Sequence, residues 1–288
     1  MSAPLLPSGL AEIADRYDAV LCDVWGVIHN GREAFPEACD ALVRFQETRG
    51  PVVLISNAPR PSKFVLPQLR GLKVPDAAWS GFVSSGDATR AELIARAPGP
   101  AWDLGPERDM VLYQGLDLAL AGPEEAAFIS CTGFIHEEVE TPEDYRERLT
   151  AAAARGLTMI CANPDLVVQK GDSLIYCAGA LAKLYTELGG TVVMAGKPYA
   201  PIYDCAYQEV DRLAGKAVDR KRILAIGDGI ATDVAGANAQ GLDLLFIAAG
   251  IHGADAIGPG GKLDEAAIAD LLEEKGARAT YAAPKLAW

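Results

Sequence analysis

Short apolar runs alternate with segments of helical spacing along this chain. The runs Tyr17–Cys22 and Pro51–Ile55 are rich in aliphatic and β-branched residues, a composition typical of buried strands. Between them, apolar residues at intervals of three and four positions predict a helix over Glu33–Arg49. A strand, a helix and a second strand in this order predict a right-handed βαβ unit with a parallel sheet.

The same alternation continues to the end of the chain. The segment SGFVSSGDATRAELIARA predicts a strand followed by a helix, with Asp87 or a nearby serine as the helix cap. Strands alternating with helices indicate an α/β fold. Further strands are expected over 110–116, 126–134, 157–168, 191–196, 222–228 and 243–250, and further helices over 61–72, 141–156, 176–188 and 263–275.

A loop-like segment rich in proline and glycine, 98–106, interrupts this pattern. We expect the chain to leave its first domain there, because such a composition is typical of segments that connect domains. The residues beyond it have their own alternation of strands and helices. The sequence therefore predicts an α/β protein with a Rossmann-like parallel-sheet core over 1–86 and 189–288, and an inserted smaller α/β cap domain over 87–188.

Polar residues stand where four of the predicted core strands end. Because parallel strands end at the same edge of a sheet, we expect these side chains to form one site. Each residue alone also has an ordinary explanation, as a turn residue, a helix cap or a solvated surface residue. The residues are Asp23, Ser56, Asn57, Lys197, Asp228 and Asp233.

The charges of this expected site favour a divalent cation. Three carboxylates side by side repel one another unless a cation binds them, and a ligand set made of oxygens suits Mg²⁺. The chain has 39 acidic and 26 basic side chains and a formal net charge of -13, so it should repel nucleic-acid backbones. We therefore expect no nucleic-acid partner, and a phosphate ligand would need the cation and Lys197 to bind.

The cysteines and the amino-terminal segment indicate the cellular compartment of the protein. The six cysteines are scattered without a CxxC pair, and several fall in apolar runs, as is typical of buried thiols in a reducing compartment. The opening segment MSAPLLPSGLAEIADRYDAV has no basic stretch ahead of an apolar one, and no apolar run approaches the length of a membrane span. We expect a cytoplasmic protein without a membrane partner.

Four motifs occur in the order DVWGV at Asp23, ISN at Ser56, GKP at Lys197 and GDGIATD at Asp228. This order resembles the phosphatases of the haloacid dehalogenase superfamily. The segment between the second and third motifs, with SSGDAT before it and ANPD at 162–165, resembles the inserted cap of class IIA of that superfamily. The class includes nucleotide and sugar phosphatases similar to nitrophenyl phosphatase and pyridoxal phosphate phosphatase. The resemblance covers nearly the whole chain.

The resemblance implies a Mg²⁺-dependent phosphohydrolase that acts on a small phosphorylated metabolite and forms a phosphoaspartate on Asp23. It implies that Lys197 screens the nucleophile from the charge of the substrate, and that Asn163 and Asp165 in the cap loop help to select the leaving group. Caps of this class often dimerise, so the resemblance also implies a homodimer through the cap. By the same resemblance, the metal ligands are Asp23, the backbone carbonyl of Trp25, Asp228 and Asp233, and the phosphate-binding residues are Ser56, Asn57 and Ala58, with Trp25 beside the leaving group.

Trp25 departs from the pattern of the resembling phosphatases, which carry a second aspartate two residues after the nucleophile. That aspartate protonates the leaving oxygen, and losing such help typically costs about 10²–10⁴-fold in rate. The indole either packs as a structural side chain or walls the leaving-group pocket, and His29 on the same loop is a candidate replacement acid.

The departure at Trp25 leaves three alternatives open. The protein hydrolyses substrates with good leaving groups, such as acyl or aryl phosphates, or it takes a proton donor from the substrate or the cap. The third alternative is a phospho-ligand-binding or regulatory protein with little or no turnover. A dinucleotide-dependent oxidoreductase is disfavoured, because no GxGxxG follows the first strand.

Overall fold

The computed structural model describes all residues of the chain except 1–2, 171–172 and 251–262. Its internal contacts divide the chain into two units. The core unit comprises Met1–Ser56, Leu66–Val83 and Tyr203–Trp288, and the cap unit comprises Asn57–Val65 and Ser84–Ile202. This division differs from the expected one, because residues 57–65, 84–86 and 189–202 group with the cap unit.

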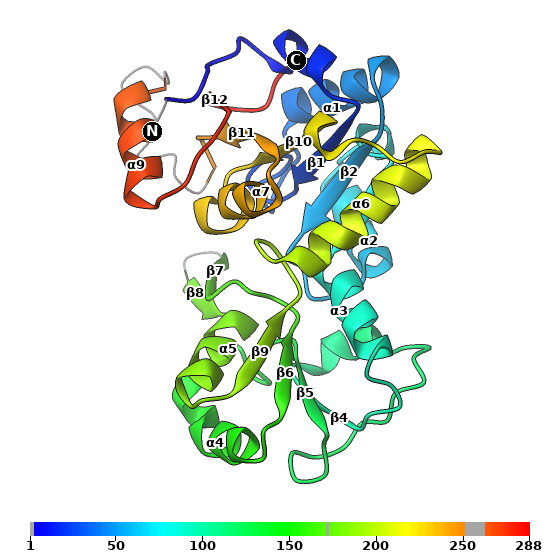
Figure 1. Cartoon of the computed structure of the whole chain (residues 1–288), viewed down its shortest axis with the longest axis vertical. Coiled ribbons are helices and arrows are strands. Elements are labelled where there is room, and N and C mark those ends of the chain that lie inside the picture. The colour runs from blue at the N-terminus through cyan, green and yellow to red at the C-terminus, as the bar shows by residue number, and fades with distance from the viewer. Residues whose placement is uncertain (1–2, 171–172, 251–262) are drawn as a thin grey trace. The chain divides into compact units, whose positions relative to one another are not determined.

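The core unit is built on a six-stranded sheet with the order β12-β11-β10-β1-β2-β3 (Figure 1). The strands β1 and β10 are buried along their whole length, which explains their continuous apolar sequences. β1 pairs in parallel with both β2 and β10, so the carboxyl ends of these three strands share one edge. The strands are β1 Ala19–Asp23, β2 Val52–Ser56, β3 Gly81–Ser84, β10 Ile223–Gly227, β11 Asp243–Ile247 and β12 Tyr281–Ala283.

Helices connect these strands as the spacing of apolar residues predicts. Helix α1 (Pro36–Thr48) begins with a proline in its first turn and buries Leu42 and Phe45, so the predicted helix over 33–49 is confirmed. The division into units falls inside α2 and α6. The other helices of this part of the chain are α2 Ser62–Gly71, α6 Ala200–Ala214, α7 Ala235–Gln240 and α9 Glu265–Glu274.

The cap unit has its own parallel sheet with the order β4-β5-β6-β9, and a short antiparallel hairpin (Figure 1). Buried residues of α4 and α5, among them Leu149, Leu181 and Tyr185, form one apolar cluster with residues of this sheet. Helix α3 is capped by Ser84, one of the two alternatives that the sequence left open, and Asp87 completes a capping box with it. The elements are β4 Ala101–Leu104, β5 Phe128–Cys131, β6 Thr158–Cys161, β7 Val167–Lys170, β8 Ser173–Tyr176, β9 Thr191–Met194, α3 Ser85–Ile94, α4 Arg146–Ala154 and α5 Ala178–Glu187.

The predictions for three segments were wrong. The proline-rich segment 98–106 contains the strand β4, and residues Glu107–Leu112 form a 3₁₀ helix where a strand was expected from 110. The strand before Lys197 is β9, which pairs with β6 in the cap sheet and not with a core strand. An isolated apolar run shows that a strand forms, but its partner depends on contacts that are distant in sequence.

Among the helices in the described part of the chain, none is both long and apolar enough to span a bilayer.

Candidate active site

Three carboxylates meet at the carboxyl edge of the core sheet. Asp23 is the last residue of β1, Asp228 directly follows β10, and Asp233 lies in the π-helical turn Ile230–Val234. One carboxylate oxygen from each lies within 4.8 Å of the others, and all three residues are buried. Such closely spaced buried charges repel one another strongly unless a cation binds between them.

The backbone passes very close to the carboxylate of Asp228 at two glycines. Gly26 has a φ of +83°, and a Cβ at this position would lie 2.1 Å from Oδ2 of Asp228. A Cβ at Gly250 would lie 1.9 Å from the same oxygen. Asp233 accepts a 3.0 Å hydrogen bond from the backbone N–H of Gly229. Glycine is therefore required where the two loops pass the Asp228 side chain.

The donor set fits a hard divalent cation. Carboxylate oxygens are the ligands that Mg²⁺ and Ca²⁺ prefer, whereas the zinc sites typical of proteins use histidine and cysteine. The cluster contains neither of these residues. The sequence prediction that Asp23, Asp228 and Asp233 come together agrees with this geometry.

Trp25 stands two residues after Asp23, and half of its surface is exposed (50%). Its indole lies over Gly31, where an added Cβ would be 3.3 Å from Nε1. A large apolar side chain that stays half exposed contributes little to a core. This exposure favours the interpretation of Trp25 as a surface available to a ligand over that of a packing residue.

His29 is buried in the same loop and takes part in its structure. The Nδ1 atom accepts a 3.0 Å hydrogen bond from the N–H of Gly31, and burial lowers the pKa of the imidazole. A neutral ring that accepts at Nδ1 carries its proton on Nε2. The geometry therefore favours a structural role for His29 over that of a replacement acid.

Asn57, Asp165 and Lys197 meet within the cap unit. The Nδ2 group of Asn57 donates to Oδ1 of Asp165 at 3.1 Å and to the backbone carbonyl of Lys197 at 3.2 Å. Its Oδ1 accepts from the N–H of Lys197 at 2.7 Å. Asn163 is part of the same arrangement, because its Oδ1 accepts from the N–H of Asp165 at 3.0 Å. Four residues that the sequence predicted for the site are therefore brought together.

Lys197 nevertheless reaches this position differently from the prediction. It follows β9 of the cap sheet and is almost fully buried, at 3% exposure. Ser56 ends β2 in the core unit, while Asn57 and Ala58 group with the cap unit. The expected single row of core-strand ends is therefore wrong for Lys197 and correct for Asp23, Ser56 and Asp228.

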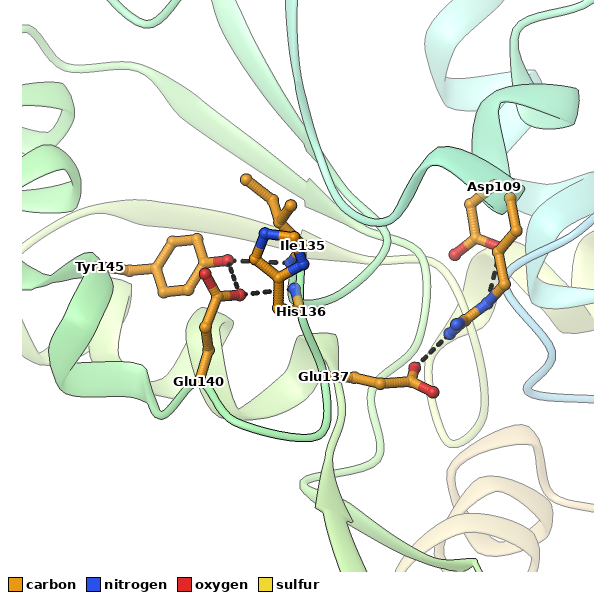
Figure 2. A network of polar contacts seen from close by, with 7 residues as sticks. Asp109, Ile135, His136, Glu137, Glu140 and Tyr145 are labelled. Atoms are coloured by element: carbon orange, nitrogen blue, oxygen red, sulfur yellow. Dashed lines mark hydrogen bonds and ion pairs between the residues drawn. The ribbon is translucent and has the colours of Figure 1, made fainter.

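A second polar network in the cap unit was not predicted from the sequence (Figure 2). Tyr145 donates to Glu140 at 2.6 Å and accepts from the N–H of Ile135 at 2.9 Å, and the N–H of His136 donates to Glu140 at 2.7 Å. Tyr145 is buried, and burial raises the pKa of its phenol. These bonds hold the loop that follows β5.

Asp109 is the unusual member of this region. Arg108 pairs with Glu137, and its Nε lies 3.9 Å from Oδ1 of Asp109 (Figure 2). Asp109 is 2% exposed, and neither of its carboxylate oxygens has a hydrogen-bond partner among the described residues. Burial raises the pKa of Asp109, although the positive charges of Arg108 and Arg60 act in the opposite direction. Asp109 lies in the 3₁₀ helix Glu107–Leu112, and an aspartate beside an arginine in the sequence gives no sign of this burial.

Comparisons with known proteins agree with this fold. Residues 20–118 match the family model described as haloacid dehalogenase-like hydrolase, and residues 194–280 match a second model of HAD-like hydrolases. A solved structure of a haloacid dehalogenase-like hydrolase from Brucella suis 1330 is 46% identical, with a TM-score of 0.84, covering 98% of this chain and 100% of that one. The chain belongs to the haloacid dehalogenase-like hydrolase family, and the resemblance read from its motifs is confirmed.

Two further relatives have more specific names. The 5'-nucleotidase YutF of Bacillus subtilis is 27% identical over 243 residues, which is 82% of this chain and 88% of that protein. A p-nitrophenyl phosphatase from Archaeoglobus fulgidus is 20% identical, with a TM-score of 0.71, covering 93% of this chain and 96% of that one. The second likeness supports the fold alone.

Proposed function

We propose that this protein is a divalent-metal-dependent phosphohydrolase, with Mg²⁺ as the metal, that acts on a small phosphorylated metabolite. The observation that carries the proposal is the buried group of Asp23, Asp228 and Asp233 at the carboxyl edge of the core sheet. The name of one relative, the 5'-nucleotidase YutF, supports the same reaction class.

Asp23 is the nucleophile of the proposed reaction. One of its carboxylate oxygens attacks phosphorus, the bond from phosphorus to the leaving oxygen breaks, and a phosphoaspartate forms. With an aryl or acyl phosphate, the leaving oxygen keeps the electron pair of the broken bond and departs as a phenolate or a carboxylate, which takes no proton from the protein. Water then attacks the phosphorus atom of the phosphoaspartate, the bond from phosphorus to the Asp23 oxygen breaks, and inorganic phosphate and the free carboxylate are released while the proton of the water passes to solvent.

The metal would be held by Asp23, the backbone carbonyl of Trp25, Asp228 and Asp233. When bound, it would neutralise the carboxylates and the negative charge on the phosphoryl oxygens. The fit rests on the all-oxygen donor set described above.

The phosphoryl oxygens would be bound by the Ser56 hydroxyl and by the backbone N–H groups of Asn57 and Ala58. Lys197 would supply a positive charge beside them, which matters in a chain with a net charge of -13. Phosphoryl transfer depends mainly on such positioning and neutralisation of charge.

Trp25 restricts the substrates in this proposal. Without a carboxyl group two residues after Asp23, the leaving oxygen lacks its usual proton donor, so alkyl phosphates should react slowly. Aryl and acyl phosphates need less help because their leaving groups are more acidic. The half-exposed indole also offers a flat apolar surface to an aromatic leaving group.

The second candidate function is a phospho-ligand-binding or regulatory protein with little turnover, and the tryptophan at the acid–base position favours it. A panel of metabolite phosphates, assayed for phosphate release with Mg²⁺ and with chelator, separates the two functions. Release that is lost in Asp23→Asn supports the enzyme, whereas binding without release supports the second candidate. A homodimer through the cap and a cytoplasmic location stay predictions.

A further inference from the structure

One amide side chain connects three segments of the cap unit. Asn57 follows the strand that ends at Ser56, Asp165 lies in the loop after β6, and Lys197 lies in the loop after β9. The amide of Asn57 bonds to both backbone polar groups of Lys197 and to the carboxylate of Asp165, at 2.7–3.2 Å. The backbone of Lys197 is therefore held by a side chain from the loop 56–58, to which the proposed function assigns phosphate binding and which we call the phosphate-binding loop.

The carboxylate of Asp165 fixes the direction of this amide. The Nδ2 group has two acceptors, Oδ1 of Asp165 and the carbonyl of Lys197, while Oδ1 of the amide faces the N–H of Lys197. A rotation of the amide by half a turn would bring its N–H groups against the N–H of Lys197 and its oxygen against a carboxylate. Only one orientation satisfies all of these groups.

Close packing leaves little freedom around this amide. A Cβ at Gly196 would lie 2.6 Å from Oδ1 of Asn57 and 2.8 Å from Oγ of Ser85. On the other side, the N–H of Gly179 at the start of α5 donates to the carbonyl of Asp165 at 3.2 Å. A Cβ at Gly179 would lie 2.1 Å from the carbonyl oxygen of Pro164. The loop that carries Asp165 is therefore seated against α5.

From these contacts we propose that Asn57 and Asp165 are positioning residues, which hold Lys197 in register with the phosphate-binding loop. The inference rests on the proposed function, and it replaces the expectation that Asp165 selects the leaving group. A fixed lysine is valuable because displacing a catalytic charge by about 1 Å can cost on the order of 10²-fold in rate.

Two substitutions at Asp165 separate positioning from substrate contact. Asp165→Ala removes one of the two acceptors of the Asn57 Nδ2 group and should lower kcat for 4-nitrophenyl phosphate by about 10²-fold. Asp165→Asn keeps an acceptor oxygen but loses the charge, and it should retain kcat within about threefold of the wild type, because the hydrogen bond is replaced by a neutral one. Equal losses in the two variants would show that the charge itself is needed, which would overturn the proposal.

A double-mutant cycle with Lys197 tests the coupling directly. Asn57→Ala keeps the backbone N–H that is assigned to the phosphoryl group, and it should lower kcat/KM by about 10²-fold in the wild type but by less than about threefold in Lys197→Ala. Equal losses in both backgrounds would contradict the proposal.

Asn238 provides a matched control. Its amide also holds both backbone polar groups of one residue, Arg278, at 2.8 Å, but in the core unit. Asn238→Ala should change kcat/KM by the same small factor in both backgrounds. If it reproduces the pattern of Asn57→Ala, the coupling is a general effect of destabilisation and the proposal fails.

The failure of the proposed function would be visible separately. A wild-type protein that releases no 4-nitrophenol with Mg²⁺ would refute the phosphatase activity. In that case, the double-mutant cycle is measured by phosphate binding, as the increase in melting temperature that inorganic phosphate produces in each variant. The proposal predicts that Asn57→Ala weakens phosphate binding in the wild type and has little further effect in Lys197→Ala. Additive losses of phosphate affinity would overturn it.

Discussion

Replacing Trp25 by aspartate restores the one carboxyl group that the proposed reaction lacks. The side chain at this position is half exposed, so a carboxyl group there would remain in contact with water and would need little desolvation. The indole loses its contact over Gly31, which is a surface contact. We therefore expect the variant to fold.

The magnitude follows from the missing proton transfer. General acid–base help is typically worth about 10²–10⁴-fold, which corresponds to about 2.7–5.4 kcal/mol of transition-state stabilisation. An alkyl phosphate with a poor leaving group should gain most of this factor. An aryl phosphate, whose leaving group needs no proton, should gain less than about tenfold.

The assay compares glycerol 3-phosphate with 4-nitrophenyl phosphate as substrates of the wild type, Trp25→Asp and Trp25→Asn. The asparagine variant has the same size but cannot transfer a proton, so it isolates the effect of the acid. The pH profile of Trp25→Asp should also gain a falling limb at high pH, where the new acid is ionised. Equal rates for the two variants, in folded protein, would refute this account of Trp25.

Three further predictions concern other parts of the structure. Asp109→Asn should stabilise the protein at pH 8 by about 1–3 kcal/mol, because a neutral amide avoids the cost of burying a carboxylate charge, which outweighs the attraction of Arg108 and Arg60. The pKa of Asp109 is raised by burial, so this gain should shrink as the pH falls through that pKa; a gain that does not change in thermal unfolding between pH 8 and pH 4 would contradict the reasoning. Gly26→Ala should weaken Mg²⁺ binding in a calorimetric titration, because the added Cβ displaces the Asp228 carboxylate. Backbone strain at this positive φ should also lower the free energy of unfolding by about 1–2 kcal/mol. Gly241→Ala, with a φ of +69° and open space around the Cβ, should show the strain alone, and equal Mg²⁺ affinities in the two variants would count against the crowding. Native protein at pH 8 should react with a thiol reagent at Cys205 first, because the other five cysteines are buried and burial raises the pKa of Cys161 and Cys177 to about 12. Fast reaction of two or more thiols before unfolding would be inconsistent with this burial.

The metal cluster could be predicted from the sequence because it depends on local signals. The apolar strands that lead to Asp23 and Gly227 are continuous, and each is followed by an acid at a turn. The rule that parallel strands end at one edge then brings Asp23 and Asp228 together, although about 200 residues separate them.

Lys197 shows where sequence reasoning reaches its limit. The strand Thr191–Met194 has the composition of a core strand, and nothing in its sequence distinguishes pairing with a core strand from pairing with β6. The role of the Asn57 amide was missed for the same reason, since its partners, Asp165 and Lys197, are 108 and 140 residues away. The surroundings of Asp109 are equally distant in sequence, since they include Arg60.

The release of 4-nitrophenol from 4-nitrophenyl phosphate, measured with Mg²⁺, with a chelator and in Asp23→Asn, tests the central claim most directly. The account predicts release with Mg²⁺, loss of release with the chelator and recovery when Mg²⁺ is restored, and no release from the folded Asp23→Asn variant. Release that survives the chelator, or that persists in Asp23→Asn, would contradict a metal-dependent reaction through this carboxylate.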